Sequence, residues 1–383
     1  MDHEIYMDNA ATTRMLPEVL DAMMPYLTDA YHNPSAIYKS TFKVRDAIQR
    51  AREQVAAAVN ADPDQVFFTS GGTEADNWIV SRSGAKQIIT SAIEHKAILN
   101  ACLRRVAQGK ASLTSIPVDA EGFVSMEVLE KSLPKSERTL VTIMAANNEI
   151  GSVQPLRQIG GLTHQMGGLF HTDAVQAIGA IPIDMLDMHI DFLSMSAHKF
   201  HGPKGIGALC CNTEYRNFPV AMIVGGSQQL NMRAGTENVA GIVGMGKAAE
   251  LAVKDMETRN AKIAALRGKL AELIFKNIPD VRLNGTCYFI DRLPNNLSVS
   301  FKGVESQQLL AMLDTRGICV SAGSACNAES VRPSHVLLAI KVPEEYVDGT
   351  IRFTLGIDTT EDDVTYTANA VAECVKAIRE MNT

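Results

Sequence analysis

Short apolar runs alternate with amphipathic stretches between about residues 65 and 211 of this chain. The apolar runs have the length and β-branched content of strands, and the stretches between them have the period of helices. This alternation predicts a mostly parallel sheet between helices, with a ligand site at the carboxyl ends of its strands. The predicted strands are Val66–Thr69, Ile88–Thr90, Leu113–Ile116, Leu140–Ile143, Leu169–Thr172, Phe192–Met195 and Ile206–Cys211. The predicted helices between them include Lys96–Val106, Met126–Leu133 and Leu156–Met166.

The pattern changes after about residue 255. A long amphipathic helix is predicted over Ala261–Ile278, with Ile263 and Leu270 on its apolar face. Shorter elements follow, namely strand Leu297–Phe301, helix Ser306–Leu313, strands Ile318–Ser321 and Thr350–Leu355, and a terminal helix from Thr360. We therefore expect an α/β fold whose large domain, residues 13–255, contains a mostly parallel seven-stranded sheet. Residues 1–12 and 256–383 would form a smaller α+β domain.

Composition and charge exclude several functional classes. The 383 residues are 46% apolar and 21% charged, which is typical of a globular protein with an ample core. The formal net charge of -7 argues against direct nucleic-acid binding, which usually requires a basic surface. No apolar stretch approaches the roughly 20 residues of a membrane-spanning helix. The start, Met1-Asp2-His3-Glu4, lacks the pattern of a secretory signal, so we expect a cytoplasmic protein.

The seven cysteines follow neither a disulfide nor a metal pattern. Their number is odd, and no pair has the spacing of a zinc site, so we expect no metal. Most lie in apolar runs and are interpreted as small buried side chains. Cys326 differs because it follows Gly323-Ser324-Ala325, in a segment without a clear period up to Pro333. We expect its thiol on a loop, where one sulfur can meet a substrate and then an acceptor.

Lys199 ends the run Ser196-Ala197-His198-Lys199, at the carboxyl end of a predicted strand. A surface lysine is the commonest alternative. The neighbouring hydroxyl of Ser196, the imidazole of His198 and the turn that begins at Gly202 make that alternative less favourable. An amine that can form a Schiff base, together with the Cys326 thiol, indicates pyridoxal phosphate chemistry on a sulfur-containing amino acid.

Two further segments fit this chemistry, and each has an ordinary alternative. Gly72 and Thr73 lie between a predicted strand and a helix, where free backbone N–H groups can cradle a phosphate. A simple glycine turn with a capping hydroxyl fits this segment equally well. Asp173 ends a strongly apolar strand and requires a cationic partner there, which a protonated pyridine nitrogen would supply. A helix N-cap is the alternative for Asp173.

Eight short motifs, in order along essentially the whole chain, together resemble the cysteine desulfurases. The branch they resemble is the NifS/IscS-like group of the class V, fold-type I pyridoxal phosphate enzymes. Each motif alone has low specificity, whereas the ordered set is highly specific. The motifs are Asp8–Thr13, Gly72–Glu74, Ile93–Lys96, Asn147–Gly151, Asp173 with Gln176, Ser196–Lys199, Arg233–Asn238 and Gly323–Cys326.

The resemblance implies pyridoxal 5'-phosphate as the cofactor. Lys199 would hold it covalently, Asp173 would pair with its pyridine nitrogen, and Gln176 would hydrogen-bond its ring hydroxyl. Thr236 would reach the cofactor phosphate from the partner subunit, which implies a homodimer. The other residues implied to bind the phosphate are Gly72, Thr73, Ser196 and His198.

The resemblance also implies the reaction. Asn148 and Arg352 would hold the carboxylate of L-cysteine, and His95 would stack on the cofactor ring and move protons. Lys199 would remove the α-proton, and the Cys326 thiolate would attack the substrate sulfur. The products would be L-alanine and a persulfide on Cys326, passed to an acceptor protein for iron–sulfur cluster assembly or other sulfur trafficking. By itself, Arg352 also fits an edge-strand arginine facing water, and His95 fits a capped surface histidine.

Two segments depart from the family pattern. Many relatives contain Asn-Pro-Ser-Ser-x-His-x-x-Gly, where this chain has Tyr38 and Thr41 in place of the histidine and the last glycine. Many also contain Gly-Gly-Gly-Gln-Glu-Arg-Gly, and here Ser227–Asn231 lacks the glutamate, the arginine and two glycines. We expect these changes to affect substrate entry, dimer contacts or rate.

Housekeeping members of the family have a longer C-terminal tail that contacts the iron–sulfur scaffold. This sequence ends at Thr383, so the resemblance does not imply a contact with that scaffold protein.

Three alternative functions stay open. A selenocysteine lyase would use the same pocket, and a class V aminotransferase would not need Cys326. A non-catalytic scaffold would keep the fold and lose turnover. The presence of Lys199, Asp173, His95 and Cys326 argues against this third alternative.

Overall fold

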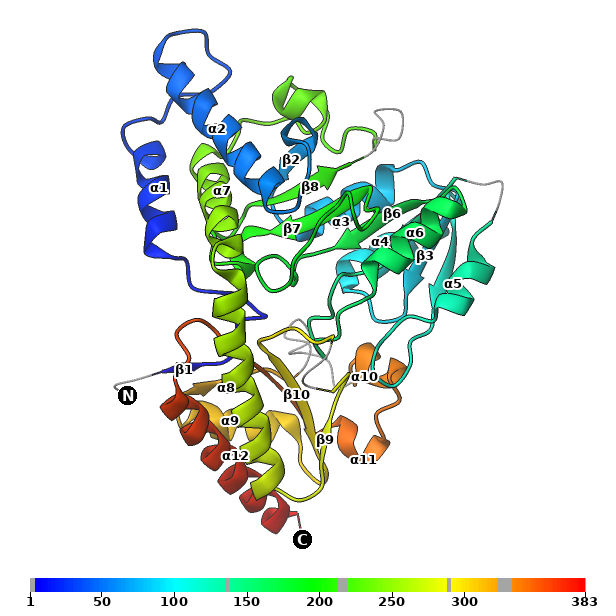
Figure 1. The fold of residues 1–383 in the computed structure, drawn as a ribbon, viewed down its shortest axis with the longest axis vertical. Coiled ribbons are helices and arrows are strands. Elements are labelled where there is room, and N and C mark those ends of the chain that lie inside the picture. Colours follow the sequence, from blue (N-terminus) through cyan, green and yellow to red (C-terminus); the bar gives the residue numbers. More distant parts are fainter. Residues whose placement is uncertain (1–3, 135–137, 213–218, 288–290, 323–332, 383) are drawn as a thin grey trace.

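A computed structural model describes residues 4–134, 138–212, 219–287, 291–322 and 333–382 (Figure 1). Its largest sheet has seven strands in the order β2-β8-β7-β6-β5-β3-β4. Neighbouring strands are parallel except at β8, which is antiparallel to both β2 and β7. The strands are β2 (Val66–Thr69), β3 (Gln87–Ser91), β4 (Ser112–Ile116), β5 (Thr139–Thr142), β6 (Leu169–Asp173), β7 (Phe192–Ser196) and β8 (Gly207–Cys211). The predicted mostly parallel sheet is confirmed.

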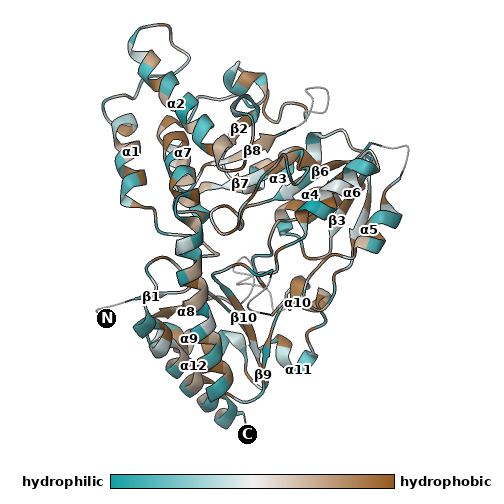
Figure 2. Ribbon diagram, in the orientation of Figure 1, coloured by the Kyte–Doolittle hydropathy of each residue, from teal (hydrophilic) through white to brown (hydrophobic). Residues whose placement is uncertain are grey.

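Successive side chains of these strands enter two separate cores, as the pleat of a strand requires. Phe67 and Ile88 pack with Trp78 on the face covered by α3 and α4. Phe68 and Ile89 belong to the larger core on the opposite face. The helices around the sheet are α1 (Pro17–Leu27), α2 (Ser40–Ala57), α3 (Gly72–Arg82), α4 (Lys96–Ala107), α5 (Met126–Ser132), α6 (Leu156–Gln165) and α7 (Val239–Val253). Apolar residues concentrate along the strands and the inner faces of these helices (Figure 2).

The C-terminal part of the chain builds a smaller unit with its own core, to which Ile5 and Met7 also contribute. An antiparallel sheet has the order β12-β10-β9, and β1 pairs with β11 in parallel. Its strands are β1 (Ile5–Tyr6), β9 (Val281–Leu283), β10 (Asn296–Phe301), β11 (Ile318–Cys319) and β12 (Thr350–Thr354). Its helices are α8 (Met256–Asn277), α9 (Ser306–Asp314), α10 (His335–Ala339), α11 (Glu344–Val347) and α12 (Glu361–Met381). The division into residues 13–255 and residues 1–12 with 256–383 stays a prediction.

Helix α8 links the two units and begins at Met256, earlier than its apolar period predicts. The preceding Asp255 has a φ of 52°, which breaks the helical path between α7 and α8. In the first turns of α8, Arg259 donates to the carbonyl of Gly179 at 3.0 Å, and Asn260 donates to the same oxygen at 3.0 Å. These polar contacts, rather than apolar packing, explain why the helix extends beyond its amphipathic part.

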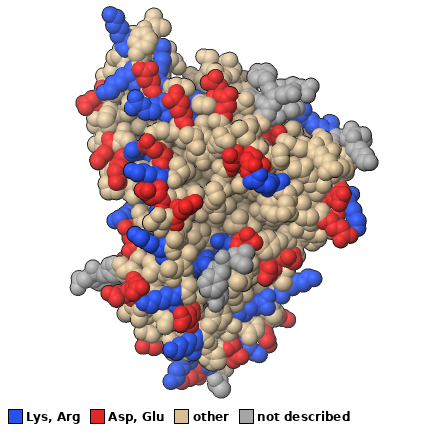
Figure 3. Space-filling view, viewed as in Figure 1, with Lys and Arg blue, Asp and Glu red and all other residues tan. Residues whose placement is uncertain are grey.

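Charged residues of both signs are interspersed over the face shown in Figure 3. Within the described ranges, no helix is both long enough and apolar enough to cross a membrane.

Two adjacent glycines of α6 provide a test of the packing. A Cβ at Gly160 would lie 2.2 Å from the carbonyl oxygen of Met188, whereas a Cβ at Gly161 would meet only His189 Cδ2 at 3.7 Å. We expect Gly160→Ala to lower the free energy of unfolding by about 1–3 kcal/mol through overpacking. Gly161→Ala should leave it unchanged or raise it by up to about 1 kcal/mol, because alanine favours helices. Urea unfolding measures both, and equal effects would contradict this packing.

Candidate active site

A cavity of about 340 Å³ lies at the carboxyl ends of the parallel strands and gathers most of the predicted site residues. Two predicted residues are not among those that line it. Thr236 is exposed on a surface segment, and Cys326 lies outside the described residues. The predicted residues that line the cavity are Gly72, Thr73, His95, Asn148, Asp173, Gln176, Ser196, His198, Lys199 and Arg352.

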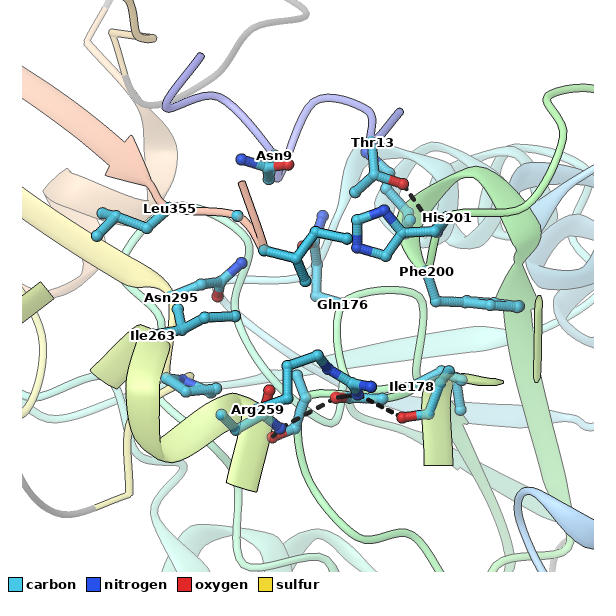
Figure 4. Close-up of a pocket in the computed structure, with 18 of the residues that line it drawn as sticks. Asn9, Thr13, Gln176, Ile178, Phe200, His201, Arg259, Ile263, Asn295 and Leu355 are labelled. Carbon is cyan, nitrogen blue, oxygen red and sulfur yellow. Dashed lines mark hydrogen bonds between the residues drawn. The ribbon is translucent and has the colours of Figure 1, made fainter. Parts of the chain in front are cut away.

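The N-terminal segment forms one wall of this cavity. Lys199 lies in the short 3-10 helix η2 (Ala197–Lys199), and its ammonium group donates to the carbonyls of Ala10 and Ala11, the latter at 2.8 Å. The side-chain amide of Gln176 also donates to the Ala10 carbonyl, at 3.0 Å. Behind this wall, a smaller cavity of about 100 Å³ is lined by Gln176, His201 and other residues between the two units (Figure 4). The amine is therefore held between two parts of the fold.

Asp173 ends β6 at the floor of the cavity and is only 6% exposed. Its Oδ1 accepts the backbone N–H of Val175 at 2.9 Å, as in the capping alternative. Burial raises the pKa of Asp173, while His95, this hydrogen bond and Lys199 act in the opposite direction. A buried carboxylate in this position is stabilised by any cation that binds in the cavity.

Two buried acids without a predicted role line the same cavity. Asp76 of α3 and Glu94 are almost completely buried. Burial raises the pKa of Glu94 to about 8, although its Oε1 accepts from Ser91 Oγ at 2.6 Å and from the Met144 N–H at 2.9 Å. Burial, followed by the nearby charge of Asp173, raises the pKa of Asp76 well above its usual range. Glu94 is therefore protonated near neutral pH.

The end of the cavity at α3 offers groups suited to an anion. Gly72 begins this helix, whose first backbone N–H groups are free of helical partners. A Cβ at Gly72 would lie 2.6 Å from Val175 Cγ2, so a larger residue would require this wall to move. The imidazole of His198 bonds Thr12 Oγ1 at 3.1 Å. Burial, together with the charges of Lys199 and Lys204, lowers the pKa of His198 to about 4 and keeps the ring neutral at pH 7.

Arg352 enters the cavity from β12 of the smaller unit and is 2% exposed, which excludes the water-facing alternative. One terminal nitrogen bonds Asp8 Oδ1 at 2.7 Å, and the other donates to the Asn148 carbonyl at 2.9 Å. Its Nε is buried and has no hydrogen-bond partner among the described residues. The guanidinium of Arg352 therefore has one N–H group, at Nε, that can still donate a hydrogen bond at the cavity wall where the two units meet.

Glu149 and His335 also line the cavity and were not predicted. The carboxylate of Glu149 accepts from Ser334 Oγ at 2.5 Å, and His335 Nε2 donates to the Glu94 carbonyl at 3.0 Å. Glu149 lies within the motif Asn147–Gly151, but the sequence of that motif does not distinguish it from an acidic residue on the surface. His335 follows a segment without periodicity, and only the docking of α10 brings it to the site.

The protonated state of Glu94 makes a prediction about stability. Between about pH 4.5 and about pH 8, the folded chain keeps a proton on Glu94 that the unfolded chain releases, so stability falls as the pH rises. Glu94→Gln is neutral at every pH and lacks this fall. We expect the free energy of unfolding of the variant, relative to the wild type, to increase from about pH 5.5 to about pH 8. Urea unfolding at both pH values checks this, and a constant difference would refute a protonated Glu94.

Comparisons with known proteins agree with this geometry. The family described as "Aminotransferase class-V" matches residues 5–366. A protein of Clostridium botulinum named "Cysteine desulfurase IscS" is 46% identical over 390 residues, covering 100% of this chain and 97% of the relative. A solved structure named "NIFS-LIKE PROTEIN" superposes with a TM-score of 0.90 at 34% identity, covering 98% of this chain and 100% of the other. A structure of SspA in complex with cysteine has a TM-score of 0.79 at 34% identity, with coverages of 92% and 98%.

Proposed function

The chain belongs to the class V aminotransferases and, within them, to the cysteine desulfurases, and we propose on this basis that it takes sulfur from L-cysteine with pyridoxal 5'-phosphate. The reaction releases L-alanine and leaves a persulfide on Cys326. The observation that carries the proposal is one cavity lined by an amine, a buried carboxylate and a buried guanidinium, namely those of Lys199, Asp173 and Arg352. The complex of SspA with cysteine supports the choice of substrate.

The residues of the cavity fit the proposed cofactor. Lys199 supplies the amine that binds its aldehyde group covalently, and the buried carboxylate of Asp173 suits a protonated ring nitrogen. Gly72 and Thr73, at the start of α3, with Ser196 and His198 suit its phosphate. Gln176 lies within the same wall and can hydrogen-bond the ring hydroxyl. When bound, pyridoxal phosphate supplies an electron sink for the carbon that loses its proton.

Residues of the protein then bind the substrate, transfer its protons and accept its sulfur. Arg352 and Asn148 hold the substrate carboxylate, and the free Nε of Arg352 supports this assignment. Lys199 would accept the α-proton of the substrate at its Nζ. His95, which lines the same cavity, would lie against the cofactor ring. The Cys326 thiolate forms an S–S bond to the substrate sulfur while the C–S bond breaks and leaves its electron pair on the carbon.

A homodimer completes this proposal, with Thr236 reaching the cofactor phosphate of the partner subunit. Exposed apolar side chains near the segments that depart from the family support such an interface. Ile37 is 95% exposed and Val224 is 88% exposed. Leu230 projects from a turn in which Gln229, Leu230 and Asn231 all have positive φ values. Contact with a second copy would remove these side chains from water.

The persulfide is passed to an acceptor protein, for iron–sulfur cluster assembly or other sulfur trafficking, and we propose that this occurs in the cytoplasm. The cysteines of the described residues are all free thiols, which suits a reducing compartment. A selenocysteine lyase stays the second candidate, because the same residues would hold selenocysteine.

The role of Cys326 is tested by product release from L-cysteine in the presence of a reductant. The wild type should release L-alanine and sulfide in equal amounts, and Cys326→Ala should release neither. Cys287→Ala is the matched control, since Cys287 is an exposed thiol of the described residues and should be dispensable. A Cys326→Ala variant with full activity would favour an aminotransferase or a lyase that does not use this thiol.

Mixed dimers test the role of Thr236. Lys199→Ala should abolish activity, and Thr236→Ala should weaken cofactor binding about tenfold through the loss of one hydrogen bond to a charged group. A dimer with one subunit of each variant contains one site with Lys199 from one chain and Thr236 from the other. We expect this site to bind the cofactor with wild-type affinity. If Thr236 acts within its own chain, the mixed dimer has no intact site and the proposal fails.

A further inference from the structure

Arg352 is paired with an acid to which neither the family resemblance nor the proposed reaction gives a role. Its terminal nitrogen Nη2 lies 2.7 Å from Oδ1 of Asp8, and the two side chains are 2% and 17% exposed. Asp8 comes from the N-terminal segment, 344 residues away in the chain. A guanidinium as buried as this one requires a compensating charge, and Asp8 supplies it.

The backbone of Asp8 is fixed against the strand that carries Arg352. Asp8 forms a parallel bridge with Thr354 of β12, two residues after Arg352. Thr354 donates its N–H to the Met7 carbonyl at 2.7 Å, and its hydroxyl accepts the Ala10 N–H at 2.9 Å. Residues two apart on a strand share a face, so the hydroxyl of Thr354 anchors the segment on the side of β12 from which Arg352 projects. The Asp8 carboxylate therefore has a set position relative to the guanidinium.

The guanidinium has a second acceptor on the larger unit. Its Nη1 donates to the Asn148 carbonyl at 2.9 Å, so the two terminal nitrogens bond groups from different parts of the fold. Since a guanidinium is planar and its donors have a fixed arrangement, two such bonds determine the direction of the Nε–H. That group is buried and has no hydrogen-bond partner among the described residues. It is a donor that stays available to a ligand in the cavity that Arg352 lines.

The same N-terminal segment contacts the groups on the cofactor side of the cavity. The Ala10 and Ala11 carbonyls accept from Lys199 Nζ. The side-chain amide of Gln176 donates to the Ala10 carbonyl as well. Residues 8–11 thus form a short link between the guanidinium and the amine. An α-amino acid has its amino and carboxylate groups on one carbon, so the groups that bind them must be held at a matching short distance.

From this geometry, and resting on the proposed desulfurase function, we propose that Asp8 is a positioning residue that makes the site specific for substrates with an α-carboxylate. Asp8 holds the guanidinium of Arg352 so that its Nε–H is directed to the substrate carboxylate. Arg352 contacts the substrate, and Asp8 acts through it. Without Asp8, the guanidinium would leave this direction, and binding a carboxylate would then include the free-energy cost of ordering the arginine side chain again.

The test compares two amines that differ only in the carboxylate, L-alanine and ethylamine. Each is titrated into the holoenzyme, and binding is followed by the absorption of the bound cofactor. We expect Asp8→Ala to weaken the binding of L-alanine about tenfold, the usual effect of losing one hydrogen bond to a charged group. Ethylamine should bind with unchanged affinity, because it has no group for Arg352. Unchanged binding of ethylamine also shows that the variant is folded and holds its cofactor.

Asp8→Asn separates orientation from charge. The amide oxygen of asparagine can still accept from Nη2 of Arg352, so the guanidinium keeps its direction. We expect this variant to bind L-alanine at least as tightly as the wild type, since no negative charge then competes with the ligand carboxylate. Asp358→Ala is the matched control. It removes the exposed ion pair of Asp358 with Arg14, 2.9 Å long and also on the N-terminal segment, and should leave both affinities unchanged.

Turnover gives a second readout. KM for L-cysteine should rise about tenfold in Asp8→Ala with kcat changed by less than about twofold, because the lost interaction acts equally before and during the reaction. Equal weakening of both amines in Asp8→Ala, unchanged binding of L-alanine in that variant, or an Asp8→Asn variant as weak as Asp8→Ala would each overturn the proposal. Sulfide release from L-cysteine by the wild type tests the desulfurase function separately, since the two amines require only the cofactor and the carboxylate site.

Discussion

Burial of negative charge at one edge of the sheet is the constraint on which the active site depends. Asp173, Asp76 and Glu94 lie together in a volume from which the fold excludes most water. The low dielectric of that volume opposes more than one unprotonated carboxylate, and the raised pKa values of Asp76 and Glu94 express this opposition. Burial also raises the pKa of Asp173, but the charges of His95 and Lys199 act in the opposite direction, so this carboxyl group is suited to a cationic ring.

The second constraint is that neither unit of the fold completes the site alone. The larger unit supplies the amine, the carboxylates and the anion-binding start of α3. The smaller unit supplies Arg352 and His335, and the N-terminal segment contributes the carbonyls that hold Lys199. An apolar cluster that includes Ile93 and Val336 joins the units at the cavity wall. The relative position of the two units therefore sets the distance between the guanidinium of Arg352 and the amine of Lys199.

The segment Ser227–Asn231, which departs from the family pattern, forms a tight turn with a buried amide. Asn231 takes the place of a glycine and adopts a φ of 64°, a conformation that asparagine tolerates better than most residues. The side chain of Gln229 accepts from the Phe68 N–H at 3.0 Å and from Arg52 at 3.2 Å. Its amide thus fills a buried polar position between β2 and α2, while Leu230 faces outward. Leu230, which stands where the family pattern has an arginine, places an apolar side chain on the surface.

The sequence by itself determined the order of elements and pointed to many of the residues that line the cavity. Short apolar runs such as Phe192–Met195 are typical of a strand buried on both faces, and each predicted strand of the large sheet forms. Lys199 and Asp173 were recognisable because polar side chains at the ends of such strands are costly without a function. The short β1 and β9 were not predicted, since two or three residues carry no measurable period.

Only the tertiary structure decided which polar residues share an environment. Asp76, Glu94 and Glu149 have no local feature that separates them from surface acids, because their burial depends on elements distant in the chain. His335 becomes a cavity residue through the docking of α10 against the strand β3 region, more than two hundred residues earlier. Tautomers and shifted pKa values follow from these contacts between distant segments, and local patterns of residues do not contain that information.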